Sequence, residues 1–294
     1  MFRLSVILIC LLFFALSACK QAGQAYTSGV FDAGVSLGTL SNPAIDEASG
    51  MDASIVNQGK YWTHNDSAGE PRIFLVEENG QYIGSVLLKG VVNRDWEEIS
   101  TGPGPDENKS YVYIGEIGDN EARYPYKFIY RIEEPVIKQG DEVMITGIDS
   151  IKFQFSDGQR DAEAFFIEPQ SKDLYLFSKR EKQISVYSLP YPQRTDSITV
   201  AKKLLTLPLT QITAADYNAS TGELLMKNYD SVYYWKQQDQ ESILLMMQRK
   251  AIVLPYEAEP QGESICFTAN GNGYLTVSEK KKGIVPAVLF YKRK

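Results

Sequence analysis

From Val30 to the end of the chain, apolar residues fall in short strand-like segments, and no stretch shows a sustained helical period. Segments such as Lys60–Asn65 and Leu174–Ser178 are rich in aromatic and aliphatic residues, which favour β-strands. Turn-forming runs such as Glu78–Gly80 and Asn270–Gly273 lie between such segments. The pattern therefore predicts an all-β domain over residues 30–294.

A short acidic motif returns five times, each time at the start of a strand-like segment. Its copies are Glu47-Ala48-Ser49-Gly50-Met51, Glu97-Glu98-Ile99-Ser100, Glu163-Ala164-Phe165-Phe166, Ala215-Asp216-Tyr217-Asn218 and Glu263-Ser264-Ile265-Cys266. The first residues of successive copies are 50, 66, 52 and 48 positions apart. A period near fifty residues suits one four-stranded blade of a β-propeller.

Further strands follow the motif in the same order in each repeat. The second strands are predicted at Lys60–Asn65, Tyr111–Ile117, Leu174–Ser178, Glu223–Asn228 and Tyr274–Ser278. The third are predicted at Arg72–Glu77, Lys127–Ile132, Ile184–Leu189, Val232–Trp235 and Ala287–Lys292. The fourth are predicted at Tyr82–Leu88, Ser150–Phe155, Lys203–Leu207 and Ile243–Gln248.

The fifth repeat ends after its third strand, so its fourth strand must come from elsewhere. The segment Val30–Leu37 precedes the first motif and reads as a strand, so it could complete the last blade and close the ring. We therefore predict a five-bladed propeller, with a six-bladed ring as the alternative. The spacing of 66 residues requires inserted loops, which we place at Pro103–Lys109 and Glu133–Glu142.

The first residues have the pattern of a lipoprotein signal peptide. Arg3 precedes an apolar run, Leu4–Leu16, that is too short to span a bilayer as a stable helix. The run ends in Leu16-Ser17-Ala18-Cys19, which is typical of lipoprotein cleavage and lipidation. We expect removal of residues 1–18, a lipid on Cys19 and a flexible tether over residues 19–29. An uncleaved signal anchor is the alternative.

The predicted anchor bears on the location of the protein. Each buried acyl methylene contributes about 0.8 kcal/mol, so more than one chain on Cys19 would hold the protein stably on a membrane. Lys20, rather than Asp, follows the cysteine, which favours the outer membrane. We therefore expect a lipid-anchored protein of the cell envelope, on its periplasmic or surface face, and a monomer.

Charge and composition exclude several classes of function. Loss of Arg3 with the signal leaves 29 basic and 37 acidic residues, a net charge of −8, which gives no electrostatic basis for binding nucleic acid. With Cys19 lipidated, Cys266 is the one remaining thiol, and its apolar neighbours indicate a buried, inert group. His64 is the single histidine, so a multi-histidine metal site cannot form, and we expect it to make hydrogen bonds.

The repeated acidic residues predict a metal site. The first strand of every propeller blade lines the central channel, so the five motifs should converge there. The candidate ligands are Glu47, Glu97, Glu163, Asp216 and Glu263, and possible supporting residues are Asp46, Asn65, Asp66, Asp95, Glu98, Glu116, Asp119, Asn120 and Asp161. Crowded carboxylates need protons or a cation, and oxygen ligands alone favour a hard cation such as Ca²⁺. The alternative is that these carboxylates accept hydrogen bonds from backbone amides of adjacent blades.

Several motifs together resemble those of a known family. Asp95-Trp96-Glu97-Glu98-Ile99, Gly115-Glu116-Ile117-Gly118-Asp119-Asn120, Asp161-Ala162-Glu163-Ala164 and Gln261-Gly262-Glu263-Ser264-Ile265, with the opening Glu47-Ala48-Ser49-Gly50, are similar to motifs of secreted bacterial propellers related to the SdiA-regulated proteins. More distantly, the pattern resembles phytase-like propellers. The resemblance implies a five-bladed ring with calcium at its channel and no assigned activity. The fourth copy departs from it, because Ala215 stands where the others have Glu.

Three functions are consistent with the sequence. We favour a metal-stabilised binding or scaffold module whose ligand, a small molecule, glycan or protein, is unknown. A calcium-dependent phosphoesterase is the second hypothesis, because a metal can activate water; its candidate phosphate-binding residues are Arg94, Arg123, Lys179, Arg180 and Lys280. Glycan binding or cleavage is the third. The sequence lacks a Gly-x-Ser-x-Gly elbow, a phosphate-binding Gly-Lys-Ser/Thr loop, a dinucleotide glycine fingerprint and paired cysteines for zinc.

Overall fold

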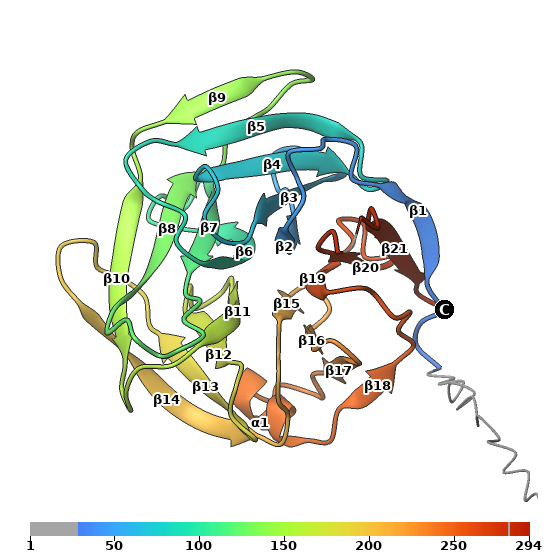
Figure 1. Ribbon diagram of the computed structural model, residues 1–294. Helices are drawn as coiled ribbons and strands as arrows, with labels where there is room; N and C mark the ends of the chain where they lie inside the picture. The colour runs from blue at the N-terminus through green and yellow to red at the C-terminus, as the bar shows by residue number, and fades with distance from the viewer. Residues whose placement is uncertain (1–28, 282) are drawn as a thin grey trace, which may run out of the picture.

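The computed structural model describes residues 29–281 and 283–294, and within them the chain forms a β-propeller (Figure 1). The inner strands are β2 (Ala48–Ala53), β6 (Trp96–Pro103), β11 (Ala162–Ile167), β15 (Ala214–Asn218) and β19 (Gly262–Phe267). They surround a central axis, and each packs against the next until β19 packs against β2, so the ring is closed. The predicted all-β propeller is confirmed. The predicted signal peptide and Cys19 lie outside the described residues.

Each inner strand begins an antiparallel meander that runs outward. After β2 come β3 (Lys60–Asn65), β4 (Arg72–Glu77) and β5 (Tyr82–Leu88); after β6 come β7 (Ser110–Glu116), β8 (Lys127–Glu133) and β10 (Asp149–Phe155). After β11 come β12 (Leu174–Ser178), β13 (Ile184–Leu189) and β14 (Thr199–Leu207); after β15 come β16 (Glu223–Lys227), β17 (Val232–Lys236) and β18 (Ile252–Leu254). After β19 come β20 (Gly273–Ser278) and β21 (Ala287–Lys292). Most of these strands agree with the sequence prediction to within two residues.

The amino-terminal strand closes the last sheet, as predicted, although it begins five residues later than the predicted segment Val30–Leu37. Strand β1 (Val35–Thr39) pairs antiparallel with β21, with Val35 opposite Phe290. Just before it, the amide of Asp32 donates a hydrogen bond of 2.8 Å to the carbonyl of Lys292. The two ends of the described chain therefore share one sheet, β1-β21-β20-β19.

The segment Ile243–Gln248 was predicted as a strand, and this prediction is wrong, because it forms the short helix α1. Ile243, Met246 and Met247 are buried and recur at the spacing of one helical face. The Ser242 side chain accepts a hydrogen bond from the amide of Leu245 and caps the helix. Strand β18 therefore takes the fourth position in that sheet.

The excess length of the second repeat forms links between sheets. Strand β9 (Glu142–Ile145) begins where an inserted loop was predicted to end, and it pairs parallel with β5 as an added outer strand. Strand β10 pairs parallel with β14, with Phe153 opposite Thr199, which joins two neighbouring meanders into one eight-stranded sheet. Strands β9 and β10 thus connect three successive meanders at the outer rim (Figure 1).

Hydrophobic clusters fill the spaces between adjacent sheets. One cluster, for example, packs Trp62 and Ile73 of the β2–β5 meander against Trp96 and Val112 of the next. Burial of this kind stabilises each sheet only together with its neighbours. Among the described residues, no helix is long and apolar enough to cross a membrane.

Candidate metal centre in the channel

Carboxylates gather at the end of the channel where the inner strands begin and the second strands end. The antiparallel register explains this, because Ala48 at the start of β2 lies opposite Asn65 at the end of β3, and Gly262 lies opposite Ser278. Residues that flank these positions are therefore neighbours although they are distant in sequence. We call the group the acidic cluster; its members are Asp66, Asp95, Glu97, Asp161, Glu163, Glu263 and Glu279.

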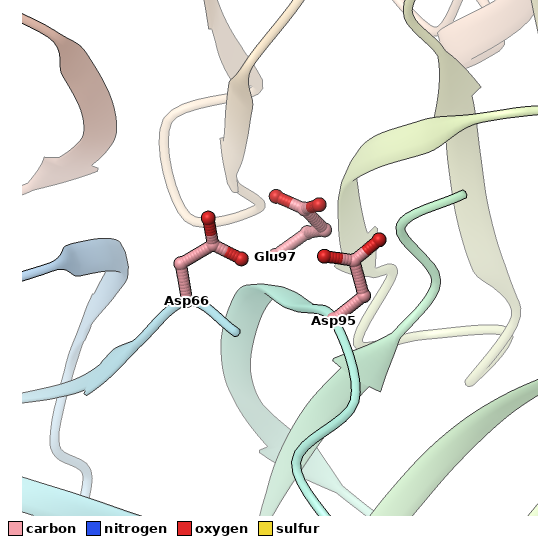
Figure 2. A group of neighbouring side chains, drawn as sticks. All are labelled: Asp66, Asp95 and Glu97. Carbon is pink, nitrogen blue, oxygen red and sulfur yellow. The ribbon is translucent and has the colours of Figure 1, made fainter. Parts of the chain in front are cut away.

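Three carboxylates of the acidic cluster lie together without a partner. Asp66, Asp95 and Glu97 each offer an oxygen, and these oxygens lie within 4.8 Å of one another. Figure 2 shows the three side chains directed toward a common space. In the part of the chain that the structure describes, no hydrogen bond or ion pair engages any of the three carboxylates, and the buried Oδ1 of Asp66 has no hydrogen-bond partner. Glu97 is only 4% exposed, so water does little to stabilise a negative charge on its carboxylate.

The electrostatics of this triad disfavour three negative charges. Burial raises the pKa of Glu97 well above its usual range, and the nearby carboxylates of Glu163 and Asp66 raise it further. Burial raises the pKa of Asp66 to about 7, with added repulsion from Glu263 and Asp95. Burial also raises the pKa of Asp95. A bound cation would offset this repulsion and keep the group ionised near neutral pH.

A second triad of the acidic cluster contains Asp66, Glu263 and Glu279, again with oxygens within 4.8 Å of one another. The pKa of Glu279 is raised to about 10 by burial and by its contact with Glu263. Oε1 of Glu263 accepts a hydrogen bond of 2.5 Å from the hydroxyl of Tyr229.

A third triad, Glu97, Asp161 and Glu163, is already neutralised in part by the protein. The buried ammonium of Lys179 forms an ion pair with Glu163, and Nε of Arg180 lies 2.6 Å from Oδ2 of Asp161. Burial alone would lower the pKa of Lys179, but Glu163 and Glu263 raise it above its usual range, so the ammonium keeps its charge. Two protein cations thus occupy this side of the acidic cluster.

Of the five predicted ligands, the structure brings Glu97, Glu163 and Glu263 into the acidic cluster. Glu47 is exposed at its margin, where partial burial raises the carboxyl pKa and repulsion from Asp46 and Glu263 raises it further. Asp46 is exposed as well. Three predicted supporting residues, Asp66, Asp95 and Asp161, belong to the acidic cluster itself.

Asp216 lies outside the acidic cluster, in a separate group with Asp52 and Glu98. Its Oδ2 accepts a hydrogen bond of 2.7 Å from the amide of Phe267 on the neighbouring inner strand. The acid of the fourth motif is one residue later than in the other copies, and successive side chains of a strand point to opposite sides. The one-residue offset therefore directs Asp216 away from Glu97, and burial raises its pKa to about 6.

Glu98 and Asp52 have the role that the alternative interpretation gave to the acidic residues. One oxygen of Glu98 accepts from the amide of Ala215, 3.1 Å away on the inner strand β15. Oδ2 of Asp52 accepts from the amide of Thr101, 2.6 Å away on β6. These carboxylates fasten inner strands to one another, and their oxygens are satisfied by the protein.

The other predicted supporting residues hold loops in place. Glu116 accepts hydrogen bonds of 2.8 Å and 3.1 Å from the amides of Arg94 and Asp95, so it positions a member of the acidic cluster. Asp119 accepts a hydrogen bond of 2.7 Å from Lys127 Nζ, and the Asn65 side chain donates one of 2.7 Å to the carbonyl of Ala44. Asn120 is exposed.

Glu279 was not among the residues predicted from the sequence, and Lys179 was predicted to bind phosphate rather than carboxylates. A signal was present, because both residues directly follow a second strand, as Asp66 does. Residues 66, 117, 179, 228 and 279 are equivalent in the repeat, and alignment of the second strands would have placed them around one end of the channel.

The candidate phosphate-binding residues are largely engaged with carboxylates. Arg94 lies 3.0 Å from Glu116, and Arg123 forms an exposed ion pair with Glu121. Lys179 and Arg180 are paired as described, and Lys280 is exposed. These contacts give the phosphoesterase hypothesis no specific support.

Other side chains that could take part in catalysis or in ligand binding are buried in the fold. His64 is fully buried, and burial lowers its pKa to about 4, so it is neutral at physiological pH. Its ring nitrogen Nδ1 lies 2.9 Å from the carbonyl of Asn65, as expected for a hydrogen-bonding histidine. Cys266 is a buried free thiol. Trp62, Trp96 and Trp235 are buried too and cannot stack on a sugar ring.

Comparisons with known proteins give structural neighbours but no family. No protein-family model matches the chain, and no curated protein matches it. Among solved structures, the chain is similar to the WD40 repeats of RRP9, with a TM-score of 0.46 and 9% identity over 90% of this chain and 100% of that one. It is also similar to a nidogen/laminin complex, with a TM-score of 0.45 and 9% identity over 80% of this chain and 77% of that one.

Proposed function

We propose that this chain is a β-propeller binding module whose channel holds Ca²⁺ at Asp66, Asp95 and Glu97, and that a lipid on Cys19 holds it at the cell envelope. One observation carries the calcium proposal. Within the described part of the chain, three carboxylates from two neighbouring sheets face one space without a hydrogen bond or ion pair of their own, while the remaining carboxylates of the channel have protein partners or belong to the adjoining triad.

The chemistry of the ligands favours calcium. Ca²⁺ binds six to eight oxygens at 2.3–2.6 Å, so two oxygens on one ion can be up to about 5 Å apart. Oxygens within 4.8 Å of one another meet this limit after small adjustments. If each carboxylate binds through one oxygen, at least three coordination positions are left for water or for oxygen atoms of a ligand. The ion would therefore stabilise the ring and offer a binding point for an oxygen-rich ligand, whether small molecule, glycan or protein.

A calcium titration monitored by thermal unfolding tests the proposal. Binding to the folded state alone adds about 2.7 kcal/mol when free Ca²⁺ is 100 times the dissociation constant. We expect Ca²⁺ to raise the melting temperature of the chelator-treated protein and Glu97→Gln to abolish most of the shift. Glu121→Gln, at an exposed site outside the acidic cluster, should retain it. Absence of bound calcium and of any shift in the unmodified protein would refute the proposal.

The anchoring proposal has its own test. Cys19→Ser removes the atom that would carry the lipid. We expect the unmodified chain in the membrane fraction of the producing bacterium and the variant outside it. Equal partition of the two proteins would contradict lipid anchoring. The resemblance to SdiA-regulated and phytase-like propellers stays a prediction. The phosphoesterase and glycan hypotheses also stay predictions, and a panel of phosphate esters and oligosaccharides would test them.

A further inference from the structure

We infer that the channel binds a second divalent cation, at Asp66, Glu263 and Glu279, with Asp66 shared between the two sites. The inference rests on the proposed function, because the shared carboxylate needs the first cation in place. Asp66 has two oxygens, and a carboxylate can bridge two ions through them. The result would be a binuclear centre at one end of the propeller channel.

Glu279 provides evidence for a ligand that is independent of the acidic composition. The residue is 8% exposed, and its buried Oε1 has no hydrogen-bond partner. Buried polar atoms without a partner are rare in folded proteins and often mark an ion or water that binds there. One oxygen of the Glu279 carboxylate lies within 4.8 Å of oxygens from Asp66 and Glu263, so the carboxylate that carries the unpartnered Oε1 belongs to the triad.

Glu263 retains coordinating capacity despite its protein contacts. The hydrogen bonds that it accepts from Tyr229 and Gln261 both go to Oε1, at 2.5 Å and 3.5 Å. Among residues 29–281 and 283–294, no hydroxyl or nitrogen donor forms a hydrogen bond to Oε2. Lys179 Nζ also approaches Oε1, at 3.9 Å, rather than Oε2. One oxygen of Glu263 is therefore available for a cation.

The third triad is the contrasting case. Lys179 and Arg180 already supply two positive charges to Glu163 and Asp161, so a metal there would meet cations as well as carboxylates. No comparable ion pair engages Asp66 or Glu279 within the described chain. The second cation is thus assigned to the one remaining triad whose carboxylates are mainly uncompensated.

The charges of a binuclear centre are close to balanced. Asp66, Asp95, Glu97, Glu263 and Glu279 bring five negative charges, and two divalent ions bring four. The Lys179 ammonium, shared with Glu163, lies beside Glu263. Such a centre would not leave a large excess of either sign in a buried space.

The two sites would connect different parts of the ring. The first joins the end of β3 to the start of β6, that is, the first two meanders. The second joins the end of β3 to β19 and the end of β20, across the boundary where the last sheet meets the first. The second cation would therefore reinforce the closure of the propeller.

A proton is the alternative occupant. A protonated Glu279 could donate a hydrogen bond to Glu263 and satisfy both groups without a metal. Stoichiometry separates the two occupants, because the proton interpretation allows at most one calcium per chain in the channel.

Equilibrium dialysis of the purified chain against increasing free Ca²⁺, with bound metal measured by mass spectrometry, tests the inference. We expect two Ca²⁺ per chain for the unmodified protein and for Glu121→Gln, and one for Glu279→Gln. Asp66→Asn should weaken both sites. Circular dichroism would verify that each variant is folded.

The outcomes separate the two proposals. One Ca²⁺ in the unmodified protein would overturn the second site and leave the first intact, and this result needs no variant. If the unmodified protein bound no Ca²⁺, both proposals would be overturned. Two in the unmodified protein and two in Glu279→Gln would overturn the assignment of Glu279.

Discussion

Glu134 shows how a single buried carboxylate can fasten two sheets. It accepts hydrogen bonds from Ser54 Oγ at 2.5 Å, from Trp62 Nε1 at 2.9 Å and from Ser110 Oγ at 2.5 Å. Each buried donor left without a partner costs about 1–3 kcal/mol. We expect Glu134→Ala to lower the free energy of unfolding by about 3 kcal/mol or more, measured by urea denaturation.

The adjacent residue provides the control. Glu133 is exposed and forms one ion pair with Lys109 at 2.7 Å. Surface pairs of this kind contribute about 0–1 kcal/mol, so Glu133→Ala should change stability little. Similar losses in the two variants would contradict the role assigned to Glu134.

Asp216 predicts a pH dependence of stability. Burial raises its pKa to about 6, whereas an unfolded Asp titrates near pH 4. The folded state therefore holds this proton more tightly, and its contribution to stability is lost as pH rises from about 4 to about 6. In Asp216→Asn the amide oxygen can still accept the hydrogen bond from Phe267. Between pH 4 and pH 6 we expect the free energy of unfolding of the variant to rise by on the order of 2 kcal/mol relative to that of the unmodified protein. Urea denaturation at several pH values measures this difference, and the same pH dependence in both proteins would contradict the assignment.

Among individual residues, the acidic motif predicted some members of the acidic cluster but not all of them. Its repetition identified Glu97, Glu163 and Glu263, because equivalent positions of a propeller converge on the axis. It could not show that Glu98 and Asp216 bond to backbone amides, since this depends on which side of the strand each carboxylate faces. Glu279 was missed because it follows a second strand, outside the motif.

At the scale of elements, strands were predictable where apolar residues alternate between turn signals. Lys60–Asn65 and Ile184–Leu189 have the predicted bounds. The segment Ile243–Gln248 was wrongly predicted as a strand because a short run such as Ile243–Met247, with five apolar residues, fits a buried strand or a helical turn equally well. The parallel pairings of β9 and β10 involve strands from different repeats, which no local pattern encodes.

The closing strand β1 fits closely against the turn between β4 and β5. A Cβ on Gly38 would overlap the backbone oxygen of Asn79, so this position in the strand excludes any larger residue. We expect Gly38→Ala to displace β1 and lower the free energy of unfolding by about 1–3 kcal/mol. Thermal unfolding would measure the loss, and Ser36→Ala, at an exposed position of the same strand, is the control. An unchanged melting temperature for Gly38→Ala would show that β1 does not depend on this contact.

For the molecule as a whole, closure determines which elements depend on one another. The amide of Lys294 donates a 3.0 Å hydrogen bond to the carbonyl of Val30, so residues from the two ends of the described chain lie side by side. Arg293 also binds Glu223 of the preceding meander through two hydrogen bonds of 2.8 Å and 2.7 Å. The last residues, Arg293 and Lys294, therefore join the last sheet to the preceding one and also contact the segment that leads into β1.

This arrangement predicts that the stability of the fold depends on the presence of β1 more than on the position of the chain ends. A circular permutant that joins residue 294 to residue 29 through a short Gly/Ser linker, and opens in the exposed loop between Glu107 and Asn108, keeps every strand pair. We expect it to fold with near-native circular dichroism and the same calcium stoichiometry. A chain that lacks residues 1–39 leaves the edge of β21 unpaired, so it should unfold at lower denaturant concentration and aggregate. If the permutant failed to fold while the truncated chain remained stable, the ring would not depend on its closing strand.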